Sequence, residues 1–512
     1  MDNFSNSQVV RKTVVAARGG VVAAQHRRAA EVGAAVLEAG GDAVDAAVAT
    51  SFAIGVVEPW MSGLAAGGCM LIWRAGDAAA HAVDYGMRSP RELDPADYPL
   101  AGEGKARDLF AWPLVKDDLN VQGATAVAVP GVVAGMALAH ERFGRMPWRD
   151  LIAPAVGLAR EGMLLDWYAA LMIASNARAL SQDADAAALF LEDGQWPPQV
   201  SWTSGTDKRL DQRRLAATLN EVASSGPSAF YAGEVAKALV KDVRDKGGCL
   251  SLEDLAAYRA HMVDALAVPY HGGRVFAAPG MTGGPTLALA LKTLSEQTKP
   301  SYVEYAKALE AAWRSRFQTM GDRDGCTTHF SVVDRTGNLC AVTQTLLSVF
   351  GSRVVSPSTG IPLNNGIMWF DPEPGKPNSL APAKRCLGNY CPVVGETPDR
   401  RRFALGASGG RKILGTVLQL SSFLIDDGVG LMEAFHRPRI DMSGEGRVIA
   451  DRALPHEVID ELNRFLPTST ARRGIFPYAF AVPAGVLRDG ELNMGCTEIM
   501  SPWGDSIAES GM

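Results

Sequence analysis

The sequence predicts an α+β fold in which helices precede most of the β-strands. Three alanine-rich apolar segments, at 28–37, 43–54 and 132–142, are separated by Gly and Pro and are typical of packed helices. After Asp324 the pattern changes, and apolar and polar residues alternate as in a strand. A glycine-rich turn at 406–410 then separates an apolar strand from an apolar helix. These observations assign a helical scaffold to the first half and the strands to the second.

The expected helices carry start and stop signals. Gly40-Gly41 ends the first helix, and Asp42 is a candidate N-cap for the second. Two amphipathic segments, at 211–224 and 232–245, extend the helical scaffold. The three apolar segments at 28–37, 43–54 and 132–142 predict that the whole of 20–165 is helical.

The alternating segment forms a predicted hairpin. Residues 327–333 make the first strand, Arg335-Thr-Gly-Asn338 makes the turn, and 339–346 make the second strand. A second strand–turn–helix unit is expected at 403–420, with its helix near 413–423. Thr327 thus opens the hairpin.

Composition excludes several classes of protein. The 512 residues are 21% charged and 47% hydrophobic, and the formal net charge is −6, which is typical of a globular protein without a strong field toward nucleic acid or an anionic membrane. No apolar run reaches the roughly 20 residues of a membrane helix, and basic residues interrupt the N-terminal apolar stretch. Seven scattered cysteines fit neither a zinc site nor a disulfide framework, and are expected to be small buried residues. We expect a cytoplasmic protein with no metal or organic cofactor.

Two segments are candidates to carry catalytic chemistry. Thr327 opens the segment Thr-Thr-His-Phe-Ser-Val-Val-Asp, and its alternative role is only that of a strand residue. Ser408 lies in Gly406-x-Ser-x-Gly410, the pattern of a serine-hydrolase turn, with His436 or His456 as downstream partner. That short pattern has many false positives. His329 is expected to be a hydrogen-bonded core residue rather than a metal ligand.

The segment at Thr327 resembles the gamma-glutamyltranspeptidase family, whose nucleophile opens a Thr-Thr-His-x-Ser-Val-Val-Asp segment. The resemblance runs from about Gly20 to Ser501. Further motifs occur in the family's order: Gly40-Gly-Asp-Ala-Val-Asp-Ala-Ala-Val48, Val129-Pro-Gly-Val-Val-Ala-Gly135, Gly247-Gly-Cys-Leu-Ser-Leu-Glu-Asp-Leu255, Asn364-Asn365 and Gly409-Gly410.

This resemblance implies a four-layer αββα sandwich of the N-terminal-nucleophile (Ntn) hydrolases, with two antiparallel sheets drawn largely from the second half. It also implies self-cleavage between Cys326 and Thr327. The products would be a large, mainly helical subunit 1–326 and a small subunit 327–512, intertwined as one heterodimer. Pairing of two such heterodimers is left open.

The resemblance further implies a role for each matching residue. Thr327 would attack the amide, and its new α-amino group, with a pKa near 7.7 to 8.0, would serve as the base. Thr345 would orient the Thr327 hydroxyl, or would simply pair across strands. The backbone N–H groups of Gly409 and Gly410 would form the oxyanion hole.

The positions that hold a glutamyl head in the family have changed. The family's arginine falls on Gly86, with Arg88 two positions on, and its later polar contacts fall on or beside Leu347, Asn365, Gly366, Trp369, Gly388 and Asn389. Arg411, after the glycine pair, is a candidate partner for a substrate carboxylate, or a surface ion-pair residue. We therefore expect cleavage of an amide of a small or dicarboxylic acid, of glutaryl or oxamate type. The alternatives are a true gamma-glutamyltranspeptidase or glutathione hydrolase, and a non-catalytic scaffold protein.

Overall fold

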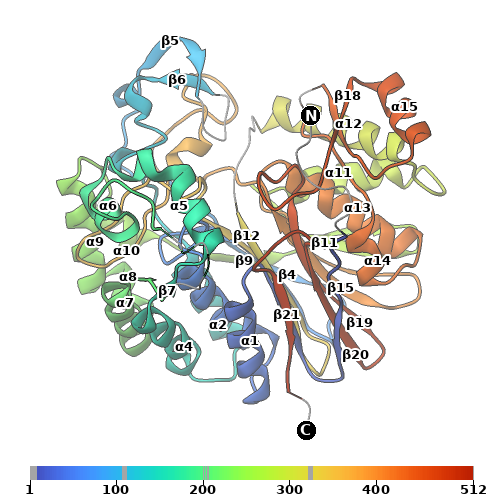
Figure 1. The fold of residues 1–512 in the computed structure, drawn as a ribbon, viewed down its shortest axis with the longest axis horizontal. Coiled ribbons are helices and arrows are strands. Elements are labelled where there is room, and N and C mark those ends of the chain that lie inside the picture. Colours follow the sequence, from blue (N-terminus) through green and yellow to red (C-terminus); the bar gives the residue numbers. More distant parts are fainter. Residues whose placement is uncertain are drawn as a thin grey trace.

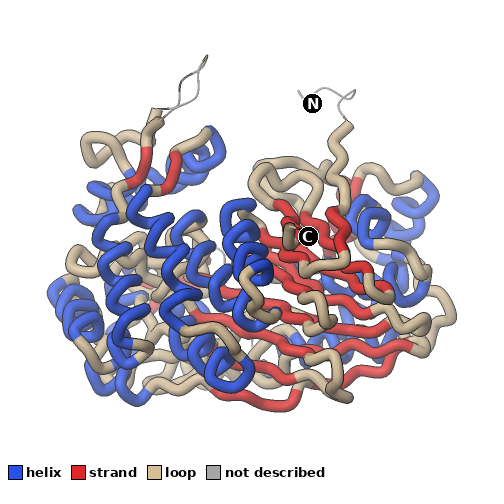
Figure 2. The backbone as a smooth tube through the Cα atoms, turned by 90° about the horizontal axis from the view of Figure 1, so that it is seen from below, coloured by secondary structure: helices blue, strands red, loops and turns tan. Residues whose placement is uncertain are grey.

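A computed structural model describes residues 9–106, 112–199, 201, 203, 207–320, 327–444 and 446–510. Within these residues the chain forms four layers, with two sheets packed face to face between two layers of helices (Figures 1 and 2). The predicted αββα sandwich is confirmed. Cys326, the residue before the predicted cleavage site, lies outside the described residues.

Two seven-stranded antiparallel sheets form the middle layers of the described structure. In spatial order, sheet I contains β21 (Asp505–Ala508), β2 (Val21–Ala24), β12 (Thr328–Val333), β13 (Leu339–Thr345), β3 (Gly67–Trp73), β4 (His81–Tyr85) and β9 (His261–Asp264). Sheet II contains β1 (Val15–Ala17), β20 (Leu492–Thr497), β19 (Val482–Asp489), β15 (Arg402–Ser408), β14 (Val393–Glu396), β11 (Gly273–Ala277) and β10 (Leu266–Tyr270). Strands β12 and β15 are therefore interior strands of their sheets.

Helices cover the outer face of each sheet. Sheet I packs against a core that includes α1 (Arg27–Glu38), α2 (Ala43–Val57), α3 (Val132–Phe143), α4 (Trp148–Glu161), α7 (Arg213–Ser225) and α9 (Glu234–Asp245). Sheet II packs against α11 (Gly284–Leu294), α12 (Tyr302–Thr319), α13 (Lys412–Asp426), α14 (Leu431–His436) and α15 (His456–Phe465). The remaining helices are α5 (Trp167–Leu180), α6 (Ala184–Phe190), α8 (Ser228–Tyr231) and α10 (Leu252–Ala257). Small sheets are made by β5 (Leu100–Lys105) with β6 (Pro113–Val115), by β7 (Met163–Leu164) with β8 (Arg209–Leu210), and by β16 (Ile440–Asp441), β17 (Val448–Asp451) and β18 (Thr468–Ala471).

Side-chain alternation along β12 connects the layers. Phe330 and Val332 belong to the core beneath the helices of sheet I, whereas Val333 belongs to the core between the sheets. Because successive strand residues point to opposite faces, Thr327, His329 and Ser331 share the face of Val333. The nucleophile predicted at 327 is thus on the side of sheet II.

The sequence-based view of the first half needs two corrections. Residues 20–165 are not purely helical, because they contain β2, β3 and β4. Half of the strands in the two large sheets precede Thr327, so the sheets are not drawn largely from the second half. Strand β3 was missed because every one of its residues is buried, and an apolar run buried on both faces does not alternate.

The predicted helix and turn signals are confirmed where they were specific. Asp42 caps α2 by accepting from Val44 N at 2.9 Å, and Asp45 Oδ2 accepts from Asp42 N at 3.1 Å, which completes a capping box. In the hairpin turn, Asp334 Oδ1 accepts from Asn338 N at 3.0 Å. Gly337 has φ +90°, a left-handed conformation that favours glycine.

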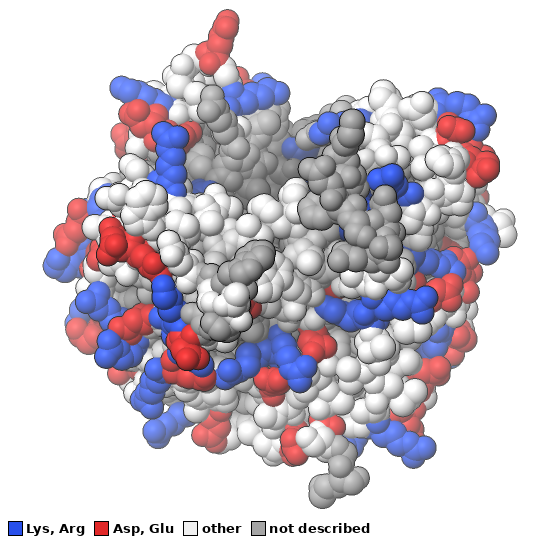
Figure 3. All heavy atoms as spheres, in the orientation of Figure 1, with Lys and Arg blue, Asp and Glu red and all other residues white. Residues whose placement is uncertain are grey.

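The surface and the cysteines fit the composition. On the face shown in Figure 3, basic and acidic side chains are interspersed. The six described cysteines are free thiols, and all except Cys249 are buried. No helix in the described ranges combines the length and apolar character needed to span a bilayer. The same residues contain no cluster of three or more His, Cys, Asp or Glu side chains arranged for a metal.

Candidate functional site

The start of β12 and the end of β15 meet at one end of the sandwich. Gln25, which follows β2, joins them: its Oε1 lies 3.2 Å from Thr328 Oγ1, and its Nε2 donates to Ser408 Oγ at 2.8 Å. Gln25 Nε2 also donates to the carbonyl of Val482 at 2.7 Å. One buried amide thus connects the residue after Thr327 with the residue before Gly409.

Thr327 and Thr345 lie beside each other in sheet I. The β12–β13 register pairs Thr328 with Gln344, so its continuation by one residue sets Thr327 opposite Thr345. Thr327 is 3% exposed and Thr345 is fully buried. Thr345 Oγ1 accepts from Leu347 N at 2.8 Å, and a hydroxyl that accepts a hydrogen bond can still donate one.

Gly409 and Gly410 make the turn from β15 into α13. Their φ values are +126° and +62°, both in the left-handed region that other residues rarely adopt. A Cβ atom on Gly409 would also lie 3.0 Å from the Cα of Ala481. Backbone geometry therefore requires glycine here, independently of any role in catalysis.

Glu58 is a buried carboxyl beside the predicted nucleophile. It is the C-cap residue that follows α2, is 5% exposed, and its Oε2 accepts from Thr328 Oγ1 at 2.7 Å. Burial raises the pKa of Glu58 to about 7, since desolvation disfavours the charged form, while the hydrogen bond from Thr328 opposes that shift. The pKa of this carboxyl therefore lies near neutral pH, and the carboxyl contacts Thr328, the residue that follows Thr327.

His329 has the structural role expected from the sequence. Its Nδ1 bonds Thr343 Oγ1 at 2.8 Å and its Nε2 bonds Ser331 Oγ at 2.9 Å. Burial lowers the pKa of His329 to about 3, so the ring is neutral at physiological pH. The ring packs against Gly406, where an added Cβ would lie 2.3 Å from His329 Cε1.

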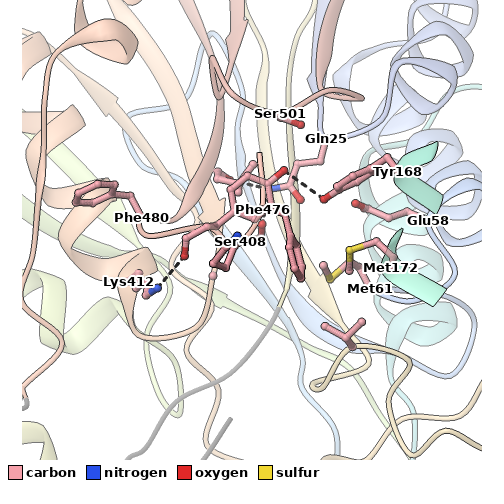
Figure 4. Close-up of a pocket in the computed structure, with 15 residues that line it drawn as sticks. Gln25, Glu58, Met61, Tyr168, Met172, Ser408, Lys412, Phe476, Phe480 and Ser501 are labelled. Carbon is pink, nitrogen blue, oxygen red and sulfur yellow. Dashed lines mark hydrogen bonds between the residues drawn. The ribbon is translucent and has the colours of Figure 1, made fainter. Parts of the chain in front are cut away.

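A cavity of about 380 Å³ opens beside this network (Figure 4). Gln25, Glu58, Ser408 and Gly409 form its polar wall. Its other lining residues are mostly apolar or aromatic: Met61, Tyr168, Met172, Val349, Phe476, Pro477, Tyr478, Phe480 and Val482, with Lys412 and Ser501. Met61 lines the cavity, whereas the adjacent Trp60 is fully buried.

The positions that differ from the glutamyl-binding pattern lie in a buried cluster around Tyr390. Leu347, Trp369 and Tyr390 belong to the core between the sheets, and the rings of Trp369 and Tyr390 meet edge to face at 5.5 Å. A Cβ on Gly388 would lie 2.2 Å from the Tyr390 ring, and one on Gly86 would lie 3.2 Å from Tyr390 Oη. Tyr390 therefore occupies space next to both glycines.

Gly366, another position of that pattern, has no room for a larger residue either. An added Cβ would lie 2.7 Å from Ala128 Cβ and 2.9 Å from Met87 Sδ. Ala128 and Met87 therefore occupy the space beside Gly366.

The remaining predicted binding residues are engaged within the protein. Asn365 is fully buried, and its amide donates to Val121 O at 2.9 Å and to Ser348 Oγ at 2.8 Å, which indicates a structural role. Arg88 Nε donates to Ala383 O at 2.7 Å. Asn389 is 6% exposed, and its Oδ1 accepts from Arg316 at 3.0 Å.

Arg411 is not the surface residue of the alternative interpretation. It is 6% exposed, donates to Ser443 O at 2.9 Å, and stacks on Phe317 with 5.5 Å between the guanidinium carbon and the ring centroid. The Arg411 guanidinium is therefore buried, and Arg411 directly follows the glycine turn.

The serine-hydrolase interpretation of Ser408 is wrong. Ser408 ends a strand whose two neighbours, β14 and β19, are both antiparallel to it, unlike the parallel sheet that carries a nucleophile elbow. In the described part of the chain, the Ser408 hydroxyl accepts a hydrogen bond from Gln25 and contacts no histidine partner.

Sequence reasoning missed Gln25, Glu58 and Lys412. Glu58 had a usable signal, because a lone carboxylate at the end of a fifteen-residue helix that is buried throughout must meet a polar partner or change its pKa. Lys412 and the segment 476–480 had no signal, since they reach the cavity only through the packing of distant elements.

Two face-to-face antiparallel sheets between two layers of helices form the architecture of the Ntn hydrolases, and Thr327 lies buried at the start of an interior strand. The gamma-glutamyltranspeptidase family model matches the chain over residues 29–325 and 303–473. The acylase ACY 1 proenzyme of Pseudomonas sp. (strain V22) is 33% identical over 493 residues, covering 86% of each chain. The glutathione hydrolase proenzyme of Bacillus subtilis (strain 168) is 30% identical over 518 residues, covering 88% of this chain and 85% of the relative.

A solved structure agrees with these relatives. The cephalosporin acylase of Bacillus halodurans superposes with a TM-score of 0.85 at 25% identity, covering 100% of this chain and 99% of that one. The chain belongs to the gamma-glutamyltranspeptidase family and is a hydrolase of the Ntn class.

Proposed function

We propose that the protein is a self-processing threonine amidohydrolase that cleaves an amide of a small or dicarboxylic acid, of the glutaryl or oxamate type. The observation that carries the proposal is the arrangement of Thr327, Thr345 and the Gly409-Gly410 turn at one end of the sandwich. Relatives named as acylases, with coverage of most of both chains, support an acylase over a scaffold protein.

Processing would begin with attack of Thr327 Oγ1 on the carbonyl carbon of Cys326. The peptide C–N bond breaks, an ester forms, and the Thr327 nitrogen becomes a free amine. Water then hydrolyses the ester and releases the carboxyl end of the large subunit. The two subunits remain one heterodimer, since each large sheet takes strands from both.

Substrate cleavage would repeat this chemistry on an external amide. The α-amino group of Thr327 accepts the hydroxyl proton as Oγ1 attacks the amide carbonyl, and the N–H groups of Gly409 and Gly410 stabilise the oxyanion. The amide C–N bond breaks and the amine leaves with that proton. Water attacks the acyl ester, the free acid departs, and Thr327 is regenerated.

The rebuilt cluster around Tyr390 supports an acyl group other than glutamyl. A charged ammonium buried without a partner costs several kcal/mol. Side chains already crowd the space at these positions: Tyr390 lies beside Gly86 and Gly388, and Ala128 and Met87 lie beside Gly366. In the described part of the chain, Trp369 Nε1 and Tyr390 Oη are buried without hydrogen-bond partners. An acyl carboxylate that reached this cluster would find two unpaired donors there.

Electrophoresis and N-terminal sequencing test the proposal. Purified protein should give bands of about 35 and 20 kDa, the shares of 326 and 186 residues in a 54.3 kDa chain of 512. The smaller band should begin Thr-Thr-His-Phe. Thr327→Ala should remain one inactive chain. Full amidase activity from an uncut chain, or normal turnover by Thr327→Ala, would refute the assignment.

A true gamma-glutamyl hydrolase is the second candidate, supported by the relatives named as glutathione hydrolases. It would process in the same way but would prefer gamma-glutamyl amides, so the comparison of acyl groups described below separates the two.

A further inference from the structure

Three buried polar side chains of the cavity wall form a connected network with Thr328. Gln25, Glu58 and Ser408 all line the cavity shown in Figure 4. Thr328 Oγ1 is fully buried and lies 2.7 Å from Glu58 Oε2 and 3.2 Å from Gln25 Oε1. These four residues, the Glu58 network, join the two large sheets, because Thr328 begins β12 and Ser408 ends β15.

The orientation of the Gln25 amide is fixed by its partners. Its Nε2 lies 2.7 Å from Val482 O and 2.8 Å from Ser408 Oγ. A backbone carbonyl can only accept a hydrogen bond, so the amide atom that faces Val482 must be the NH2 group. The other amide atom, Oε1, therefore faces Thr328, and it can only accept.

Thr328 has one proton for two acceptors when Glu58 is ionised. A hydroxyl donates one hydrogen bond, and a carboxylate only accepts. The proton that Thr328 gives to Glu58 is then not available to Gln25, so Gln25 Oε1 loses Thr328 as its donor. A buried acceptor that loses its donor costs free energy, because it has given up water and gains nothing in return.

A protonated Glu58 satisfies all members of the network. The carboxyl O–H can donate to Thr328 Oγ1, which leaves the Thr328 hydroxyl free to donate to Gln25 Oε1. The Gln25 amide donates in turn to Ser408 Oγ. All these hydrogen bonds then run in one direction, from Glu58 to the end of β15, and a single proton on Glu58 distinguishes the complete network from the interrupted one.

We propose that Glu58, in its protonated form, is a positioning residue for cleavage of an amide at Thr327. It completes the network and so holds the start of β12 against the end of β15. Loss of its proton removes the hydrogen bond from Thr328 to Gln25 and loosens the nucleophile relative to the Gly409 turn. The role in cleavage rests on the function proposed above, whereas the network itself does not.

The surroundings of Glu58 keep its carboxyl protonated below neutral pH. Burial raises the pKa of Glu58 to about 7. Among the described residues that line the cavity, the other titratable groups are Lys412 of α13, Tyr168 of α5 and Tyr478. Burial raises the pKa of Tyr478 to about 12, so this residue is neutral where Glu58 titrates. Lys412 is the cation, and its Nζ donates to Tyr478 O at 2.9 Å.

Two further titratable groups adjoin the network along the chain. His26 follows Gln25, and burial lowers its pKa to about 3, so its ring is neutral. The α-amino group that cleavage would create on Thr327 precedes Thr328. Because this amine exists only after cleavage, a test on the uncut chain observes Glu58 without it.

The first test needs no enzymatic activity. It uses the full chain with Thr327→Ala and measures a double-mutant cycle in Tm for Thr328→Val and Gln25→Met. At pH 5.5 the two changes should be coupled, because each removes the same hydrogen bond, and at pH 8.5 the coupling should be lost. With Glu58→Gln added, the coupling should persist at both pH values, because the amide of the new side chain remains a donor.

The second test measures catalysis on glutaryl 4-nitroanilide. The ratio of kcat/KM for Glu58→Gln to that for wild type should be near one at pH 5.5 and should rise to about ten at pH 8.5, as expected for one hydrogen bond. In the Gln25→Met background Glu58 still bonds Thr328, but the network is already interrupted, so the ratio should stay near one. Glu457→Gln, at an exposed carboxyl, is the matched control and should give a ratio near one at both pH values.

The two tests separate the network from the function on which its role depends. Equal coupling at pH 5.5 and 8.5 would overturn the network. A kcat/KM ratio near one at pH 8.5 would overturn the positioning role, and a rise that persists in Gln25→Met would do so too, because the charge of Glu58 would then act on Thr327 directly. Coupling that depends on pH, in a protein that cleaves neither glutaryl nor gamma-glutamyl anilides, would support the network and refute the proposed function.

Discussion

The hydroxyl of Thr328 donates to Glu58 Oε2 at 2.7 Å, so a buried carboxyl contacts the residue next to the proposed nucleophile. The same hydroxyl bonds Gln25, which bonds Ser408 in the facing sheet. The strand that carries Thr327 and the strand that leads to Gly409 are therefore held together by a chain of side chains that contains one titratable group.

Glu58→Gln should change how stability depends on pH. Burial raises the pKa of Glu58 from 4.5 to about 7 in the fold, so the native state binds its proton more tightly than the unfolded state does. The contribution of Glu58 to stability is greatest below pH 4.5 and is lost as pH rises toward 7, by on the order of 3 kcal/mol. The Tm of Glu58→Gln relative to wild type should thus be higher at pH 8 than at pH 5.

Exposed Glu457 provides the matched control, because Glu457→Gln should shift Tm equally at both pH values. If Glu58→Gln behaves like that control, Glu58 titrates as an ordinary exposed carboxyl and its proposed environment is wrong.

Gly406→Ala should destabilise the sandwich. The new methyl group would lie 2.3 Å from the His329 ring, which is itself fixed by Thr343 and Ser331. Overpacking of this kind costs about 1–3 kcal/mol, and should appear as a lower Tm. Gly157→Ala in α4 is the control, because an added Cβ there meets nothing within 4 Å. It should be neutral or stabilising by up to about 1 kcal/mol. Equal Tm values for the two variants would contradict the close contact.

Thr345→Ala should process slowly and turn over slowly. The variant removes the hydroxyl opposite Thr327 and the acceptor for Leu347 N. Loss of a positioning hydrogen bond of roughly 2 kcal/mol corresponds to a fall of about 30-fold in kcat/KM. Thr345→Ser retains the hydroxyl and should recover most of both rates. Band intensities over time and kcat/KM measure the two effects; a Thr345→Ala enzyme with wild-type rates would restrict Thr345 to strand pairing.

Glutaryl 4-nitroanilide should be cleaved in preference to the gamma-glutamyl compound. Gly86, Gly366 and Gly388 cannot carry the polar side chains of the glutamyl site without displacing their neighbours. Sites that lose hydrogen-bonding groups discriminate strongly, so the ratio of kcat/KM values could reach about a hundredfold. Arg411→Ala should reduce that ratio if Arg411 pairs with the acyl carboxylate, and Arg411→Lys should reduce it less. Preference for the glutamyl compound in wild type would favour the transpeptidase alternative.

Tyr390→Phe should weaken the same preference by a different route. The variant keeps the ring that packs on Trp369 and removes only Oη, which has no hydrogen-bond partner among the described residues. If Oη binds the acyl carboxylate, kcat/KM for the glutaryl anilide should fall about tenfold, in line with a hydrogen bond to a charged group of 1.5 kcal/mol or so. An unchanged kcat/KM with an unchanged or raised Tm would show that Oη does not bind substrate.

Local patterns in the sequence were sufficient for several features. These features each depend on neighbours within a few residues: the capping residue Asp42, the turn at 335–338, the hairpin at Thr327 and the glycines at 409–410. The family resemblance, carried by motifs in a fixed order, then predicted the sandwich, which is confirmed. Short-range hydrogen bonds and backbone conformation depend on nearby residues, so the sequence by itself predicts them.

Only the tertiary structure decided the rest. Strand β3 is buried on both faces and so lacks the alternation that marks a strand, and the raised pKa of Glu58 depends on desolvation by segments far away in the chain. The cavity between α5 and the 476–480 segment, with Lys412 at its wall, likewise exists because distant residues pack together. Burial and long-range contacts depend on how the whole chain packs, so no local sequence pattern predicts them.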